Sequence, residues 1–225
     1  MLSDTTTITL ALPLKLGRVN CYLVKTAQGH ILIDTGSSNQ RPVLEQELHR
    51  AGCQPGDLKL IMLTHGDFDH TGNAAYLRQT FNAPLAMHPA DFAMIGRGAM
   101  FASRSHHNPV FSAIAPLMFR FGKSNRVTPD LELTEAFDLS IYGLDAQVIA
   151  LPGHSRGSIG LLTAAGDCFV GDLLENTRQP ALNSIMDDGA AAQTSVEKLR
   201  SLKAKVIYPG HGAPFQLADL KYAPS

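Results

Sequence analysis

Side chains that could bind metal are concentrated in the segment from Leu63 to Asn73. Within six positions this segment holds two imidazoles and two carboxylates: His65, Asp67, Asp69 and His70. Such groups are the ligands through which proteins bind zinc, iron or manganese ions. In an ordinary soluble domain they are scattered over the solvated surface. Their concentration between a strand-like run and a helix-like run therefore predicts a metal site rather than a polar turn.

More candidate ligands follow other apolar runs along the chain. Glycine-flanked His or Asp residues come after three further runs: His154, Asp172 and His211. Asp34 likewise follows the apolar run Ile31–Ile33. Glycine lets the backbone of such loops approach closely, and loops on a packed scaffold can hold ligands in a fixed geometry. We therefore expect the opening motif and these three further strand ends, four in all, to bring their His and Asp side chains to one site.

The elements that must position these side chains can be read from apolar periodicity and turn residues. Strands are expected at Thr7–Leu16, Asn20–Lys25, His30–Asp34, Leu58–Leu63, Pro84–Met87, Leu131–Leu133, Phe137–Tyr142, Gln147–Leu151, Ile159–Ala164, Cys168–Val170 and Lys205–Tyr208. Helices are expected at Pro42–Ala51, Ala74–Phe81, Ala90–Ile95 and from Thr194 to Leu202, the last opened by a capping box. This order predicts one α/β domain over residues 1–225, built from two similar halves that each pair a sheet with covering helices.

Residues 96–126 interrupt this alternation of strands and helices. The segment is rich in Met and Phe, with several Gly, Ser and Pro residues and few acidic ones. One interpretation is an insertion that completes the core. The other is a mobile apolar wall over a pocket, where Met and Phe adapt to an apolar ligand. The pair His106-His107 lies in it and is expected at the surface rather than among the metal ligands.

The composition narrows the functional class. The 225 residues are 44% hydrophobic and 17% charged, which suits a buried globular core. A net charge of −1 gives no reason to expect nucleic acid or an anionic membrane as a partner. No apolar run approaches the ~20 residues that span a bilayer, and the first residues do not resemble a secretory signal. Three widely spaced cysteines without a Cys-x-x-Cys pair favour buried free thiols and a cytoplasmic protein.

Taken together, these motifs resemble those of the metallo-β-lactamase superfamily. That family carries a strand-end Asp, then His-x-His-x-Asp-His, His, Asp and His in this order. The resemblance runs from Asn20-Cys-Tyr-Leu-Val to Tyr208-Pro-Gly-His-Gly212 and includes Pro152-Gly-His-Ser-Arg-Gly-Ser158. It implies a four-layer αβ/βα sandwich with a two-metal site at the edge of the two sheets.

The resemblance also implies a role for each candidate residue. The first metal would be bound by His65, position 67 and His154. The second would be bound by Asp69, His70 and His211. Asp172 would bridge the two ions, and Asp34 would orient ligands from behind. His88, which ends a strand, is then expected to be structural, because every ligand position is already filled.

One position departs from the common pattern, because Asp67 replaces the second His of the motif. A third carboxylate lowers the bare charge of a site with two divalent ions from about +2 to about +1 by simple addition. A hard oxygen ligand shifts preference from zinc, the usual metal of the family, toward iron or manganese. The flavin-partnered di-iron oxygen reductases of the superfamily resemble this, with Glu at that position. Alternatively, Asp67 binds weakly and only the second metal is held tightly.

The leading hypothesis is a metal-dependent hydrolase of a small-molecule ester, thioester or lactone bond. A dinuclear site can generate a nucleophilic hydroxide near neutral pH, and Asp69 is the candidate for proton transfer. The substrate would carry an apolar group that contacts residues 96–126. A Gly-x-Ser-x-Gly elbow is not needed, since Ser155 sits beside a metal-ligand candidate. The oligomeric state is left open, with a homodimer among the options.

Other functional classes stay open. A di-iron module that reduces oxygen or nitric oxide fits Asp67 but needs a separate electron donor, because no flavodoxin-like domain follows. A β-lactamase-like amide hydrolase is less favoured, given Asp67 and the missing signal peptide. Glyoxalase II is disfavoured because the chain ends soon after Gly212, and RNA processing because there is no basic insertion. A binding or regulatory module without turnover would have no physical reason to keep so complete a ligand set.

Overall fold

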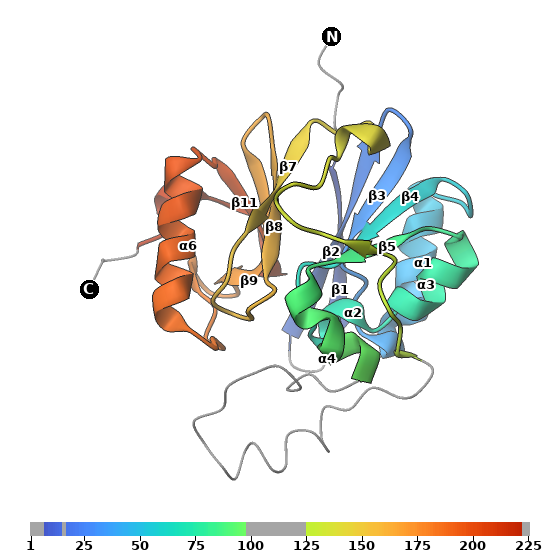
Figure 1. The fold of residues 1–225 in the computed structure, drawn as a ribbon, viewed down its shortest axis with the longest axis horizontal. Coiled ribbons are helices and arrows are strands. Elements are labelled where there is room, and N and C mark those ends of the chain that lie inside the picture. Colours follow the sequence, from blue (N-terminus) through green and yellow to red (C-terminus); the bar gives the residue numbers. More distant parts are fainter. Residues whose placement is uncertain (1–6, 15–16, 98–124, 222–225) are drawn as a thin grey trace.

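In the computed structural model, which describes residues 7–14, 17–97 and 125–221, the chain forms a long mixed sheet with helices on its outside (Figure 1). The strands are β1 Thr7–Leu14, β2 Gly17–Thr26, β3 Gly29–Ile33, β4 Leu58–Met62, β5 Leu85–Met87, β6 Leu131–Glu132, β7 Ala146–Ala150, β8 Ile159–Thr163, β9 Asp167–Asn176, β10 Ala181–Leu182, β11 Val206–Gly212 and β12 Phe215–Gln216. The helices are α1 Arg41–Arg50, α2 Phe68–Thr71, α3 Ala74–Phe81, α4 Phe92–Arg97 and α6 Gly189–Ser201, with short 3-10 helices η1 Ser38–Gln40, η2 Pro89–Asp91, η4 Ser140–Tyr142 and η5 Leu217–Asp219.

The strand order divides the sheet into two halves. Strands run in the order β6-β5-β4-β3-β2-β11-β9-β8-β7, with β1 beside β2, β10 beside β9 and β12 beside β11. The seam lies between β2 and β11, which pair at Val19 and His211. The N-terminal half of the sheet is therefore β6-β5-β4-β3-β2, and the C-terminal half is β11-β9-β8-β7. A candidate ligand, His211, lies directly at the seam.

Alternation of side chains along the strands separates the layers. On β2, Cys21 and Leu23 pack in one cluster with Leu44 of α1 and Leu77 of α3. The intervening Tyr22 and Val24 point the other way. They pack in a cluster that also contains residues of the C-terminal half: Val148, Leu161 and Phe169. The N-terminal half thus buries one face against helices and the other against the second half.

The C-terminal half repeats this arrangement with a different helix. Cys168 and Val170 of β9 pack with Val196 and Leu199 of α6, while Phe169 between them faces the inner cluster. In Figure 1, α6 flanks one side of the sheet, and α1 and α3 flank the other. The layers are therefore helix, sheet, sheet, helix, and the predicted αβ/βα sandwich is confirmed.

Two predicted elements differ in the structure. Residues 137–142, expected as a strand, make one isolated bridge at Asp138 and then the 3-10 helix η4. The Asp138 carboxylate accepts a hydrogen bond from the backbone N–H of Ser140, which favours a turn over an extended strand. Helix α6 begins earlier than Thr194, at Gly189, because Asp188 caps it by accepting from the N–H of Ala191.

Most of the Met/Phe-rich segment 96–126, including His106-His107, lies outside the described residues, so both interpretations of that segment stay predictions. The same holds for Lys15 and Leu16 at the end of the first expected strand. Among the residues that the structure does describe, no helix is both long enough and apolar enough to cross a membrane.

Candidate metal centre

The opening motif folds into a loop and one short helix at the end of β4. Asp67 stands at the position before α2, and its backbone carbonyl accepts hydrogen bonds from the N–H groups of His70 and Thr71. The Thr71 hydroxyl donates to the same carbonyl at 2.9 Å. This single turn carries both Asp69 and His70, and Asp69 Oδ2 lies 4.0 Å from His70 Nε2. The close spacing in the sequence is thus converted directly into close spacing at the site.

His65 is fully buried, and its ring is oriented by a chain of two hydrogen bonds. The Thr64 hydroxyl donates to Asp34 Oδ2 at 2.8 Å and lies 2.9 Å from His65 Nδ1. Since the hydroxyl hydrogen is used on Asp34, the His65 Nδ1–H donates to the hydroxyl oxygen. The Nε2 atom of His65 is left with its lone pair facing the site. Outer partners of this kind orient the histidines of metal sites.

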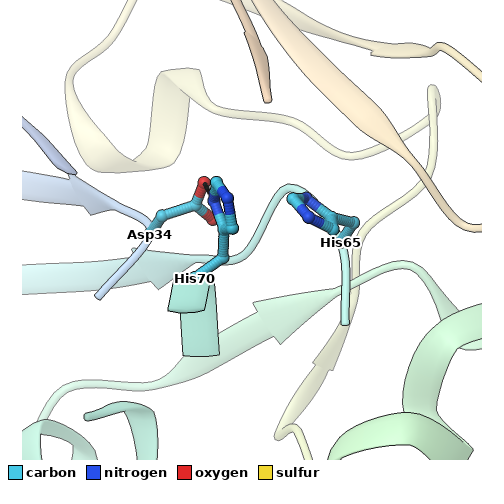
Figure 2. Close-up of side chains that lie close together, drawn as sticks. All are labelled: Asp34, His65 and His70. Carbon is cyan, nitrogen blue, oxygen red and sulfur yellow. Dashed lines mark hydrogen bonds and ion pairs between the residues drawn. The ribbon is translucent and has the colours of Figure 1, made fainter. Parts of the chain in front are cut away.

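Asp34 orients a second histidine directly. His70 Nδ1 donates to Asp34 Oδ2 at 2.8 Å, and Asp34 Oδ1 accepts from the backbone N–H of Thr64 at 2.8 Å. Figure 2 shows the Asp34 carboxylate against the His70 ring, with His65 on the far side of that ring. The ring centroids of His65 and His70 are 4.2 Å apart. One buried carboxylate thus supports both imidazoles from behind, in the position that the resemblance implied for it.

His154 comes from the loop between β7 and β8, in the other half of the molecule. Its Nδ1 donates to the carbonyl of Ile185 at 2.7 Å. The loop containing Ile185 is itself tied to the His154 loop, because the N–H groups of Asp187 and Asp188 both donate to the carbonyl of Gly153. The His65 and His154 rings lie edge to face, with centroids 4.6 Å apart. The two halves of the sheet therefore meet at these rings.

Asp172 and His211 lie within strands rather than beyond strand ends, which corrects the sequence-based expectation. Strand β9 continues to Asn176 and β11 to Gly212. The hydrogen-bonded register between these strands shifts on both sides of Pro209, so the pairing survives as an irregular stretch. Gly210 permits the close approach, because a Cβ there would lie 2.1 Å from Asp172 Oδ1. His211 Nε2 lies 3.2 Å from Asp172 Oδ2.

The candidate ligands form two adjacent groups of three. The first triad consists of His65, His154 and Asp172, and all three residues are buried. The second triad consists of Asp69, His70 and His211, of which Asp69 and His211 are partly exposed. Within each triad the ligand atoms lie within 4.8 Å of one another. Asp172 also connects the triads, since its Oδ1 is 3.3 Å from His70 Nε2.

Asp67 lies beside the first triad. Its Oδ2 is 3.1 Å from His154 Nε2 and 3.8 Å from His65 Nε2. The structure therefore brings all of the predicted ligands together, with Asp34 behind them. His88 stays apart from the site: its Nδ1 accepts from the backbone N–H of Ala90 and caps η2.

The buried polar atoms of the site fit bound cations. His65 Nε2, His70 Nε2 and Asp172 Oδ1 are buried, and none of the described residues gives them a hydrogen bond of good geometry. Buried polar atoms normally have partners, because an unpaired one costs about 1–3 kcal/mol. Imidazole nitrogens and carboxylate oxygens are the donor set of zinc, iron and manganese sites, and within each triad they lie within 4.8 Å of one another. Metal ions would supply the missing partners.

The two triads differ in electrostatics. Burial, together with the neighbouring rings of His70 and His154, lowers the pKa of His65 well below its usual value. Burial, the largest single influence, acts in the same direction on His70 and His211, but the nearby carboxylates together outweigh it and the pKa of each is raised. The carboxylates of Asp172, Asp34 and Asp69 act on His70, and those of Asp172 and Asp69 act on His211. Although burial opposes ionisation of Asp172, the His70 and His211 rings lower the pKa of that carboxyl.

Several supporting residues were not found from the sequence. Asn20 Nδ2 donates to the carbonyls of Pro209 and Gly212, on either side of His211, and the Tyr22 hydroxyl donates to that of Pro209 at 2.6 Å. Asn20 and Tyr22 belong to the motif Asn20-Cys-Tyr-Leu-Val that carries part of the family resemblance, but the sequence did not indicate what either residue does at the site. Asp91 contacts the loops that carry both histidines of the first triad. Nothing in the sequence marked it as a supporting residue, because it lies in an ordinary helix-start sequence.

Residues 14–211 match the family model of the metallo-beta-lactamase superfamily. The chain belongs to this superfamily. It is 29% identical over 213 residues to metallo-beta-lactamase domain-containing protein 1 of Rattus norvegicus, covering 89% of this chain and 68% of that protein. A probable metallo-hydrolase of Methanocaldococcus jannaschii is 30% identical over 197 residues, covering 86% of this chain and 87% of the relative.

Solved structures agree in fold. The BLEG-1 B3 metallo-beta-lactamase superposes with a TM-score of 0.71 at 21% identity, covering 94% of this chain and 95% of the other. TTHA1623, solved in a di-iron-bound form, gives a TM-score of 0.70 at 27% identity, with 93% and 95% covered. The expectation of a metallo-β-lactamase-fold enzyme of the metal-dependent hydrolase class is therefore confirmed at the level of the family.

Proposed function

We propose that this chain hydrolyses an ester, thioester or lactone bond of a small molecule, with two divalent metal ions bound by the two triads. The observation that carries the proposal is the pair of triads itself, buried at the seam of the two half-sheets and connected through Asp172. Two ions bound there would lower the pKa of water and polarise the bond under attack. Hydrolysis is also the activity for which relatives such as the probable metallo-hydrolase of Methanocaldococcus jannaschii are named.

The position of each residue suggests its role in the proposed reaction. One ion would be held by His65, His154 and Asp67, the other by Asp69, His70 and His211, and both by Asp172. Asp69 is the proposed proton acceptor. Its carboxylate lies 3.6 Å from His211 Nε2 and is partly open to solvent. Burial raises the pKa of Asp69, which strengthens it as a base.

An apolar substituent on the substrate is supported by a residue at the site. Ile185 is 55% exposed, although its carbonyl holds the His154 ring. An exposed aliphatic side chain next to the candidate metal centre can contact an apolar group of a ligand. We therefore propose an uncharged or weakly charged small-molecule substrate rather than nucleic acid, in keeping with the net charge of −1.

The compartment is a separate proposal. Cys21, Cys53 and Cys168 are all buried free thiols. Thiols of this kind persist in a reducing compartment, which favours the cytoplasm. We propose no particular oligomeric state.

Metal analysis of the purified protein, followed by a hydrolysis panel on the reconstituted form, tests the proposed function. The panel contains esters, thioesters, lactones, phosphoesters and a β-lactam. We expect about two ions per chain and turnover of at least one acyl compound that is lost with a chelator and restored by metal. Two bound ions with no hydrolysis across the panel would contradict the proposal.

A di-iron redox centre is the second candidate, and Asp67 favours it. Its carboxylate lies beside both histidines of the first triad, and the structural relative TTHA1623 has been solved with two irons. A carboxylate at this place makes the site less positive and harder, which suits iron or manganese more than zinc. The variant Asp67→His tests whether Asp67 sets the metal preference of the site. We expect the variant to shift toward zinc, whereas an unchanged metal preference would show that Asp67 is not a ligand.

A further inference from the structure

Asp91 is a buried carboxylate that belongs to neither triad. It ends the 3-10 helix η2 and is 1% exposed. Its Oδ2 accepts hydrogen bonds from the backbone N–H of Gly66 at 3.2 Å and from the Ser155 hydroxyl at 2.6 Å. Its Oδ1 accepts from the backbone N–H of Gly157 at 3.0 Å. One side chain thus joins two loops that are far apart in the sequence.

Both loops carry ligands of the first triad. Gly66 stands between His65 and Asp67, and Ser155 directly follows His154. The first loop extends from β4 in the N-terminal half, and the second connects β7 to β8 in the C-terminal half. Asp91 therefore spans the two halves of the molecule at the point where their histidine rings meet. The separation of these rings depends on the separation of the loops.

The second loop is shaped around the Asp91 carboxylate. A Cβ on Gly157 would lie 2.6 Å from both Cγ and Oδ1 of Asp91, so only glycine permits this approach. Ser155 is fixed by a further bond, because its hydroxyl oxygen lies 2.8 Å from that of Ser158. The Ser155 N–H also donates to the Ser158 hydroxyl at 3.0 Å. The hydroxyl that donates to Asp91 is thereby held in one orientation.

The second triad has different supports. His70 donates to Asp34 at 2.8 Å, and the strand that carries His211 is held by Asn20. The contacts of Asp91 described above all fall on the loops of the first triad. A change at Asp91 should therefore act on one metal position and spare the other.

We propose that Asp91 is a positioning residue that sets the spacing of the His65–Asp67 loop and the His154 loop, and through it the affinity of the first triad for its ion. The inference rests on the metal-binding role proposed above. It requires no contact between Asp91 and the ion, since the carboxylate acts through the backbone and Ser155. It adds to the reaction a residue that neither triad contains.

Asp91→Asn is the primary test. An amide has one acceptor oxygen, so in either orientation its NH2 group faces the N–H of Gly66 or of Gly157, and one link is lost. Loss of such an outer partner typically weakens metal binding by about 10–100-fold. We expect that loss for one of the two ions, with the other bound as in the wild type. Zn²⁺ and Co²⁺ are titrated into metal-free protein against a chelator, and the Co²⁺ spectrum reports the altered ligand field.

Asp130→Asn is the matched control. Asp130 also accepts from a backbone N–H, that of Leu85, and pairs with Arg78 away from the site. This variant should lose stability without losing an ion. Ser155→Ala keeps both backbone links and should weaken the first ion less than Asp91→Asn. Gly157→Ala displaces the carboxylate and should resemble Asp91→Asn, which covers the case in which Asp91→Asn fails to fold.

The proposal is overturned if Asp91→Asn or, where that variant does not fold, Gly157→Ala binds both ions with wild-type affinity and spectrum while only its melting temperature falls. Equal weakening of both ions also overturns it, as does a wild-type protein that binds fewer than two ions. If Asp91→Asn selectively loses one ion but the wild-type protein hydrolyses nothing in the panel, the positioning role of Asp91 would be supported and the proposed hydrolase function would be contradicted. The two failures are thus distinguishable.

Discussion

The first and second triads differ in burial, origin and charge. The first is fully buried, and its His65 comes from the N-terminal half while His154 and Asp172 come from the C-terminal half. The second is partly exposed, and two of its members, Asp69 and His70, lie in one short helix. The pKa of His65 is lowered by burial, whereas those of His70 and His211 are raised because the neighbouring carboxylates, Asp172 first among them, together outweigh burial.

This difference indicates a division of roles. Both triads can exist only after the two halves have packed, because His211 of the second triad also comes from the C-terminal half. The first triad is the fully buried one, so its ion would fasten the interior of the seam as well as take part in the reaction. The second triad opens toward solvent, so water and substrate would arrive on its side. Experiments that affect one triad and spare the other test this division, whereas changes to shared residues should abolish it.

Asp172→Ala should have the largest effect, because Asp172 contacts both triads. An ion contributes several kcal/mol of transition-state stabilisation, and each 1.4 kcal/mol is a factor of ten in rate. We expect kcat/KM to fall by roughly a thousandfold or more, with loss of both ions. Metal content and steady-state kinetics measure this. A variant that retains two ions and near-normal kcat/KM would remove Asp172 from the centre.

Asp34→Asn should weaken both ions by about 10–100-fold, because the carboxylate supports His70 directly and His65 through Thr64. Asparagine tolerates the left-handed backbone at this position, where φ is 59°, so the change acts on hydrogen bonding more than on the backbone. Titration of both ions measures the loss. Weaker binding of only one ion would show that the hydrogen-bonded bridge through Thr64 does not contribute to metal binding by His65.

Acidification should remove the ion of the second triad first. Protons compete with metal for imidazole nitrogen, and a histidine with a raised pKa takes its proton at higher pH than one with a lowered pKa. His70 and His211 should therefore protonate above about pH 6.5, the usual histidine pKa, and His65 only well below it. Ion content after equilibration between about pH 8 and 5, with the Asp91→Asn spectrum identifying the first-triad signal, measures the order. Simultaneous loss, or loss of the first-triad ion first, would contradict it.

Asn20→Ala should have the smallest effect and is the counterpart of Asp91→Asn. It removes the hydrogen bonds to the carbonyls of Pro209 and Gly212 around His211, while Tyr22 still holds Pro209. One such bond is worth roughly 1 kcal/mol, so the second ion should bind about fivefold more weakly and the first should not change. Asn176→Ala, which removes a similar bond to the carbonyl of Ala213, is the control. An equal effect on both ions would argue against separate supports.

The second triad shows which features of the site are local. Asp69 and His70 are neighbours in the sequence and neighbours in space, because α2 needs only one turn to present both. Strands β3 and β4 and helices α1 and α3 likewise followed the expected apolar periods to within a residue or so at each end. By contrast, the predicted start of α6 and the predicted strand at residues 137–142 were wrong. In each case a single Asp side chain, at 188 and 138, accepts a backbone hydrogen bond that changes the local structure.

The first triad shows what the sequence could not provide. Its members are separated by long stretches of chain, and only the order of motifs in a known family linked them. The resemblance named ligands and Asp34, yet it did not mark Asp91, whose acceptor role depends on two loops meeting around it. The apolar runs that precede Asp172 and His211 placed both residues beyond strand ends, whereas β9 and β11 pair past both residues.

The sequence by itself determined the chemistry available to this protein: imidazoles and carboxylates in a family-specific order, with a third carboxylate at Asp67. Tertiary structure alone decided how these groups are supported and how closely they lie to one another. The physical reason is that ligand identity is a property of single residues and short spacings. Burial, ring orientation and the hydrogen bonds of Asp34 and Asp91 arise only when the two half-sheets pack face to face.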